Sequence, residues 1–245
     1  MHQLAHNFQE LQENERVAVL ASVIEQYAGA TEDLMMAYWV LRVLKEKQQL
    51  SVLDAYLAID IKEQKNSDFS TRRMLNHLKR ATRKSFINKL GLPQPERIRL
   101  LNTHLEAAEL FEANTSKELS YLKWVDTTIL FLKAIGRDRL KDRPQGGSLV
   151  NVYNKIKHGS LFFYNKPRNE IVFPIAKGKR PNWYKITFIE ISGTMIDSIG
   201  KKMEQINSCI SDLYFFYLLN KDPNKAIAAK QLARDWTFTG GPVQL

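Results

Sequence analysis

Apolar residues recur at three- and four-residue spacing through most of the chain, and this periodicity is what most constrains the fold. Such spacing is typical of helices that bury one face. It is interrupted after Gly159, where short runs such as EIVFPI and WYKITFIEI alternate apolar and polar residues between turn signals. We therefore predict a mainly α protein, a helical bundle with a small antiparallel β-hairpin at about 161–191, inserted before the C-terminal helix.

The 245 residues are enough for one large domain or two small ones. Thr31 is followed by two acidic residues, which is typical of a helix start, because a threonine caps the first turn and acids favour its positive end. We expect an N-terminal helical segment at 1–30, a bundle at 31–225 and a peripheral tail at 226–245.

Positive charge is concentrated in two parts of the chain. The formal net charge is +10, and residues 62–99 carry 11 basic and 3 acidic side chains while residues 133–185 carry 13 and 3. The rest of the chain has a net negative charge. This segregation favours one basic surface formed by two separate segments, which would attract an anionic partner, although two solvated runs of charge are the alternative.

Residues 71–90 are predicted to form one amphipathic helix, which Gly91 and the following prolines end. Met74, Leu78 and Phe86 share its apolar arc, and a basic stripe lies opposite. The segment RDRLKDRPQGG, after Gly136, is interpreted as an exposed loop that could contact phosphates. The candidate nucleic-acid-binding residues are Arg73, His77, Arg80, Lys84, Arg137, Arg139 and Arg143.

The segment VYNKIKHGS, residues 152–160, concentrates residues that could carry chemistry. Ser148 as a cap and Gly159 as a terminator predict a short helix, on which Asn154 and His158 share a face. The last turn of a helix favours a protonated imidazole, which could bind phosphate or transfer a proton at a ribose hydroxyl. The alternative is that His158 only caps the helix. The candidate catalytic residues are Tyr153, Asn154, Lys155, Lys157 and His158.

The YNKIKHG segment resembles the motif of the HEPN superfamily, helical-bundle proteins in which an arginine and a polar residue precede a histidine. The resemblance implies a metal-independent endoribonuclease of a phage-defence or toxin–antitoxin system, often a homodimer with two motifs meeting across the interface. It maps Asn154 and His158 onto the family's polar residue and histidine. Tyr153 stands where the family has arginine, so the cation would have to come from another residue.

Two functional hypotheses follow. The first is an RNA-directed HEPN-like protein, either a nuclease or a binding relative that does not cut. The second is a non-catalytic helical module that binds nucleic acid or a partner protein through its basic surface. Metal-ligand spacings and glycine-rich phosphate loops are missing from the sequence, so no cofactor and no metal are expected. A single cysteine and the lack of a long apolar run favour a cytoplasmic protein without a membrane partner.

Overall fold

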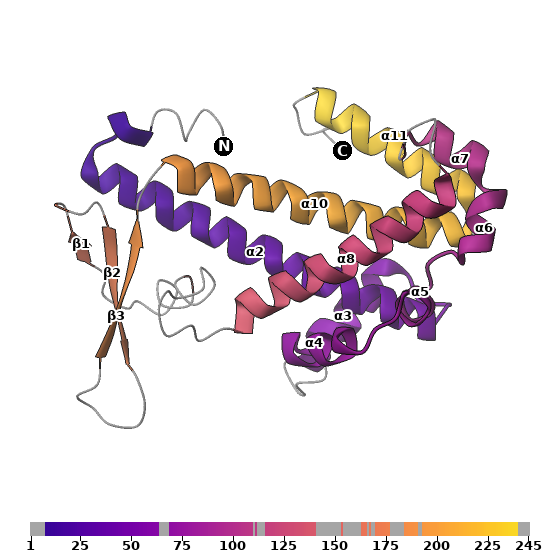
Figure 1. Ribbon diagram of the computed structural model, residues 1–245, viewed down its shortest axis with the longest axis horizontal. Coiled ribbons are helices and arrows are strands. Elements are labelled where there is room, and N and C mark those ends of the chain that lie inside the picture. Colours follow the sequence, from indigo (N-terminus) through magenta and orange to yellow (C-terminus); the bar gives the residue numbers. More distant parts are fainter. Residues whose placement is uncertain are drawn as a thin grey trace. The chain divides into compact units, whose positions relative to one another are not determined.

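The computed structural model describes residues 8–63, 69–109, 111, 116–140, 153, 163–165, 167, 170–176, 184–190 and 193–239. These residues are mainly helical, as the periodicity predicts (Figure 1). The helical elements are η1 (Phe8–Glu10), α2 (Glu13–Glu46), α3 (Val52–Glu63), α4 (Thr71–Lys79), α5 (Arg83–Leu90), α6 (Pro95–Leu100), α7 (Asn102–Ala107), α8 (Lys117–Leu140), α10 (Gly193–Lys221) and α11 (Pro223–Thr239).

The alternating segment forms three antiparallel strands in the order β1-β2-β3, namely β1 (Phe163–Asn165), β2 (Glu170–Ala176) and β3 (Tyr184–Glu190). These strands lie within 161–191, where the sequence predicted a small antiparallel β-hairpin. Strand β1 pairs with β2 only as far as Val172, whereas β3 pairs along all of β2.

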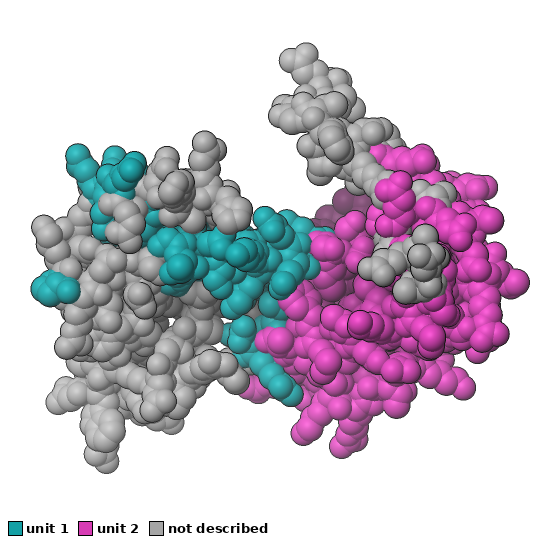
Figure 2. All heavy atoms as spheres, turned by 45° about the horizontal axis from the view of Figure 1, so that its top comes forward, with its two compact units in different colours: residues 1–33, 135–207 teal, residues 34–134, 208–245 magenta. Residues whose placement is uncertain are grey.

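The chain divides into two compact units, residues 1–33 with 135–207 and residues 34–134 with 208–245 (Figure 2). In the first unit, Leu20, Ile24 and Tyr27 of α2 are buried, as is Ile199 of α10. Burial, together with the charge of Asp138, raises the pKa of Tyr27 to about 12. This unit also contains the three strands.

Aromatic side chains form the centre of the second unit. The Phe216 ring of α10 lies 4.3 Å from the Trp124 ring and 4.9 Å from the Tyr121 ring, both of α8. The Trp124 indole donates a hydrogen bond to Asp212, at 3.2 Å. Burial raises the pKa of the Asp212 carboxyl, an effect that Lys230 and this hydrogen bond partly offset. Large rings and one satisfied polar group thus join α8 to α10.

The connection between α5 and α6 is anchored on this aromatic core. Gly91 ends α5 in the left-handed conformation, with φ of 66°, as predicted from the sequence. Its carbonyl accepts a hydrogen bond from the Asn220 amide, at 2.9 Å, and the Pro93 carbonyl accepts one from the buried Tyr121 hydroxyl, at 2.8 Å. Two hydrogen bonds from distant helices therefore fix this turn.

Two predicted boundaries fall inside helices of the structure. Helix α2 runs through residue 31, and the Thr31 hydroxyl donates to the Ala28 carbonyl, at 2.7 Å, instead of capping a new helix. The apolar face continues on both sides, and a threonine inside a helix can bond the preceding turn. The expected peripheral tail from residue 226 begins inside α11, where Ala226 is fully buried. A small apolar residue at a helix contact carries little sequence signal.

Candidate nucleic-acid interface

The predicted catalytic segment falls almost wholly outside the described residues. Asn154, Lys155, Lys157 and His158 all lie there, and Tyr153, the described member of the group, is helical and half-buried. The geometry of a motif at 153–158 therefore stays a prediction. Apart from Tyr153, the predicted functional residues that the structure describes lie in the basic segment 62–99 and at the end of α8.

Residues 71–90 form two helices, α4 and α5, where the sequence predicted one. Ser70 caps α4 by accepting from the Arg73 backbone N–H. Thr82 and Ser85 form a reciprocal capping box at the start of α5, in which each side chain accepts from the other residue's backbone N–H. The box favours an extended Thr82, with ψ of 161°, which separates the helices.

The apolar side of both helices is buried, including Met74, Leu78 and Phe86. Of the predicted basic stripe, Arg73, Arg80 and Lys84 are exposed, but the fourth member, His77, is half-buried. The break between the helices therefore leaves most of the stripe in contact with solvent and turns one residue toward the protein.

His77 packs against α2. Its ring meets Trp39 edge to face with centroids 5.5 Å apart, and its Nδ1 lies 2.5 Å from Nη1 of Arg42. Because a guanidinium has no acceptor, Nδ1 must accept this hydrogen bond and the proton of the neutral ring is on Nε2. Burial lowers the pKa of His77, and the charges of Arg42, Lys89 and Arg73 lower it further. The histidine is thus held neutral inside a positive field.

Arg42 is the main residue that the sequence analysis missed, because it lies outside both basic segments. Its guanidinium lies 5.2 Å from the centroid of the Trp39 ring, and 3.5 Å from a carboxylate oxygen of Glu46. The Glu46 side chain is 67% exposed, so solvent screens this ion pair. Glu46 therefore offsets the positive charge of Arg42 only weakly. The four-residue spacing of Arg42 and Glu46 was visible in the sequence, but the contact with His77 requires the fold.

Arg42, Arg73, His77 and Lys89, from α2, α4 and α5, are called the cationic cluster below. Two neighbouring basic residues, Arg83 and Arg99, form ion pairs with carboxylates. Arg83 binds Asp126 through two hydrogen bonds, at 2.8 and 2.5 Å, and lowers the pKa of that carboxyl. Arg99 forms an ion pair with Glu118 through its Nε. Carboxylates of α8 therefore neutralise part of the excess positive charge of residues 62–99.

The second predicted basic segment, residues 133–185, is described only in part. Helix α8 continues to Leu140, so Arg137 and Arg139 are helical and do not belong to a loop as predicted. The Arg137 side chain is exposed and belongs to the other compact unit. The Arg139 side chain and the whole of Arg143 lie outside the described residues.

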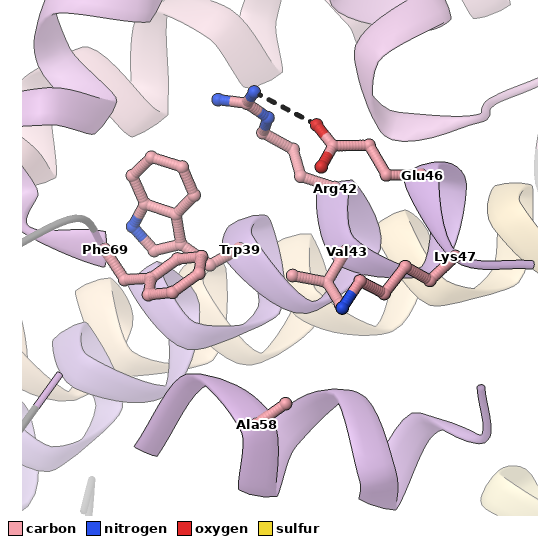
Figure 3. A pocket seen from close by; sticks show the side chains of 7 residues that line it. All are labelled: Trp39, Arg42, Val43, Glu46, Lys47, Ala58 and Phe69. Carbon is pink, nitrogen blue, oxygen red and sulfur yellow. Dashed lines mark hydrogen bonds and ion pairs between the residues drawn. The ribbon is translucent and has the colours of Figure 1, made fainter. Parts of the chain in front are cut away.

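A pocket of about 110 Å³ opens beside the cationic cluster (Figure 3). Trp39 and Phe69 form one wall, with ring centroids 5.3 Å apart, and Arg42 and Glu46 lie above them. Trp39 is only 4% exposed, and its indole N–H has no hydrogen-bond partner among the described residues. The tryptophan is therefore a packing residue that supports Arg42, and it offers little surface to a ligand.

The described part of the chain has neither a metal-binding cluster nor a membrane-spanning helix. It contains no group of three or more histidine, cysteine or acidic side chains placed to hold a metal ion. None of its helices has the length and hydropathy needed to cross a bilayer. Comparison with protein-family models, with curated proteins and with solved structures finds no match for this chain.

Proposed function

We propose that this protein binds RNA, with the cationic cluster as a contact for the phosphate backbone. The observation that supports the proposal is that the positive charges of Arg42, Arg73 and Lys89 all act on one imidazole, that of His77, and that the Arg42 guanidinium contacts this ring. Such a concentration of charge at the surface attracts a polyanion and releases counterions when it binds one. The exposed Arg80 and Lys84 extend the same two helices with further positive charge.

The choice of RNA comes from the resemblance of residues 153–158 to the HEPN motif. In this proposal the chain is a HEPN-like helical protein of a bacterial defence or toxin–antitoxin system. His158 transfers the proton, Asn154 orients it, and a lysine or arginine from elsewhere replaces the cation missing at Tyr153. Binding through the cationic cluster does not require cleavage, so the two activities are tested separately.

The binding test is a filter-binding titration of single-stranded RNA at several salt concentrations. The informative variant is Arg73→Gln with Lys89→Gln, and the matched control is Arg83→Gln with Arg99→Gln, which removes the same charge from two residues that carboxylates already neutralise. The logarithm of the binding constant should fall linearly with the logarithm of salt concentration. The cluster variant should flatten that slope by about 1.4, since each single-strand phosphate contact contributes about 0.7.

The control should retain most of the original slope. Equal losses in the two double variants would show that net charge alone drives binding and would overturn the assignment to the cluster. Binding without any salt dependence would reject RNA and would favour a protein partner that is recognised through apolar contacts.

The cleavage test uses the same RNA with EDTA present, and compares the unmodified chain with His158→Ala. Cleavage that persists in EDTA and falls by about 100-fold or more in the variant would support proton transfer by His158, the usual scale of general acid–base catalysis. Undiminished cleavage in the variant would remove His158 from the mechanism. Salt-sensitive binding without cleavage would leave the protein as an RNA-binding relative of the nucleases.

A further inference from the structure

A second pocket, of about 290 Å³, lies at the turn between α5 and α6. It is separate from the cationic cluster, and no predicted site residue lines it. The end of α2, the end of α5, the start of α6 and the last turn of α10 all contribute to it. Its polar lining consists of Lys45, Asn88, Gln94, Arg97 and Asn220.

The lining of this pocket is cationic and rich in amides, and it contains no carboxylate. Within the described residues neither Lys45 nor Arg97 forms an ion pair, in contrast to Arg99, which lies on the same short helix and pairs with Glu118. Two cations that line the same pocket without a carboxylate between them repel each other. An anion bound between them offsets this repulsion.

The amides add directed hydrogen-bond donors. The Gln94 amide donates to Oδ1 of Asn88, at 2.6 Å, which leaves the Asn88 amide nitrogen available as a donor. Asn88 is exposed at the end of α5, next to the pocket. A planar guanidinium, an ammonium group and an amide N–H together match the several acceptor oxygens of a phosphate better than the two of a carboxylate.

The backbone beneath the pocket is held in place. A Cβ added at Gly91 would lie 3.3 Å from Cδ of Lys45 and 3.3 Å from a ring carbon of Tyr217, so the lysine stem rests directly on the glycine. The Gly91 carbonyl is fixed by Asn220, and the Pro93 carbonyl by Tyr121. A site built on such a turn needs little rearrangement to bind, which lowers the entropic cost of binding.

We infer that this pocket binds a phosphate monoester dianion, with Lys45 and Arg97 as the charged ligands and Asn88 as a neutral donor. The inference does not depend on RNA binding by the cationic cluster. The phosphate group could belong to free phosphate or a nucleotide, or to the 5′ end of an RNA strand, and the chemistry of recognition is the same in each case.

The first experiment is a calorimetric titration of the full chain with inorganic phosphate, against sodium chloride of matched ionic strength. The variants are Lys45→Gln and Arg97→Gln, and the matched controls are Lys47→Gln and Arg99→Gln, which remove the same charges two residues away. All four side chains are exposed, so folding should be retained, and thermal melts monitored by circular dichroism check this. Each pocket variant should raise the Kd for phosphate by about tenfold or more, the loss expected for one charge-assisted hydrogen bond.

The controls should bind phosphate as the unmodified chain does. No phosphate binding, or equal weakening in the pocket variants and the controls, would overturn the inference. A second titration compares the 5′-phosphorylated and 5′-hydroxyl forms of one short oligoribonucleotide. A preference for the phosphorylated form that Arg97→Gln abolishes would support an RNA end as the source. Equal binding of the two forms, with phosphate binding retained, would support free phosphate or a nucleotide.

Discussion

At the scale of single residues, burial lowers the pKa of His77 and so favours the neutral ring, and Arg42 adds to this effect. The guanidinium donates to Nδ1 across 2.5 Å, so a proton on that nitrogen would bring two positive charges together and remove a hydrogen bond. Lys89 and Arg73 act in the same direction. The histidine that sequence periodicity placed on the cationic stripe therefore contributes a neutral acceptor, and its role is to hold Arg42 at the surface.

This arrangement predicts a pH dependence of stability. Because the pKa of His77 is lower in the folded chain than its ordinary value of 6.5, the unfolded chain binds more protons in the interval between the two values. The contribution of His77 to the free energy of unfolding is therefore complete above pH 6.5 and is lost as the pH falls toward the folded pKa. His77→Asn keeps an acceptor near the position of Nδ1 but cannot be protonated.

Urea unfolding of both chains at a series of pH values below 6.5 measures the difference. The unmodified chain should lose more stability than His77→Asn as the pH falls, because groups common to both chains cancel in the comparison. Parallel curves for the two chains would contradict the proposed contact between His77 and Arg42.

At the scale of elements, the break between α4 and α5 is set by local side-chain chemistry. Thr82 and Ser85 satisfy backbone donors that the start of a helix leaves unpaired. The expected cost of Thr82→Ala is about 1 kcal/mol in the free energy of unfolding, the usual value of an N-cap. Thr103→Ala is a matched control, because Thr103 is an exposed threonine inside helix α7 and alanine has the higher helix propensity.

Chemical denaturation of both variants measures these effects. Thr103→Ala should change the free energy of unfolding by only a few tenths of a kcal/mol or increase it slightly. If Thr82→Ala matched the control, the break would have to be imposed by tertiary packing, and the capping box would be incidental.

The same element shows what could be predicted from sequence. The Gly91 terminator was recognised because only a left-handed residue ends a helix in this manner, and the backbone confirms it. The Thr82 box was missed because a serine at its third position is a weaker signal than the usual glutamate. The prediction at Thr31 failed in the opposite direction. The neighbouring residues in the sequence are typical of a helix start, but Thr31 lies inside α2, whose apolar face continues on both sides.

At the scale of the whole molecule, apolar periodicity predicted a helical protein and composition predicted its excess positive charge, but neither could predict which charges are neutralised. Arg83 and Arg99 have carboxylate partners 43 and 19 residues away along the chain, and such pairings follow from the fold alone. The pocket at Gly91 was equally inaccessible, because Lys45, Arg97 and Asn220 come from three distant parts of the sequence. Local sequence patterns therefore predict the helices, whereas the candidate sites depend on how the helices pack against one another.

The net charge of +10 leads to a final prediction about ionic strength. Repulsion among excess positive charges destabilises a folded chain, and salt screens it, since the Debye length falls from about 10 Å at 0.1 M to about 3 Å at 1 M. Exposed ion pairs such as Arg83 with Asp126 weaken at the same time, but each contributes little. Sodium chloride should therefore raise the free energy of unfolding, by about 1 kcal/mol or less, the scale of surface charge interactions.

The increase should be smaller in the variant that combines Arg73→Gln with Lys89→Gln. Thermal melts of the two chains across a salt series measure it, and stability that falls with salt would show that the ion pairs outweigh the repulsion of the cluster.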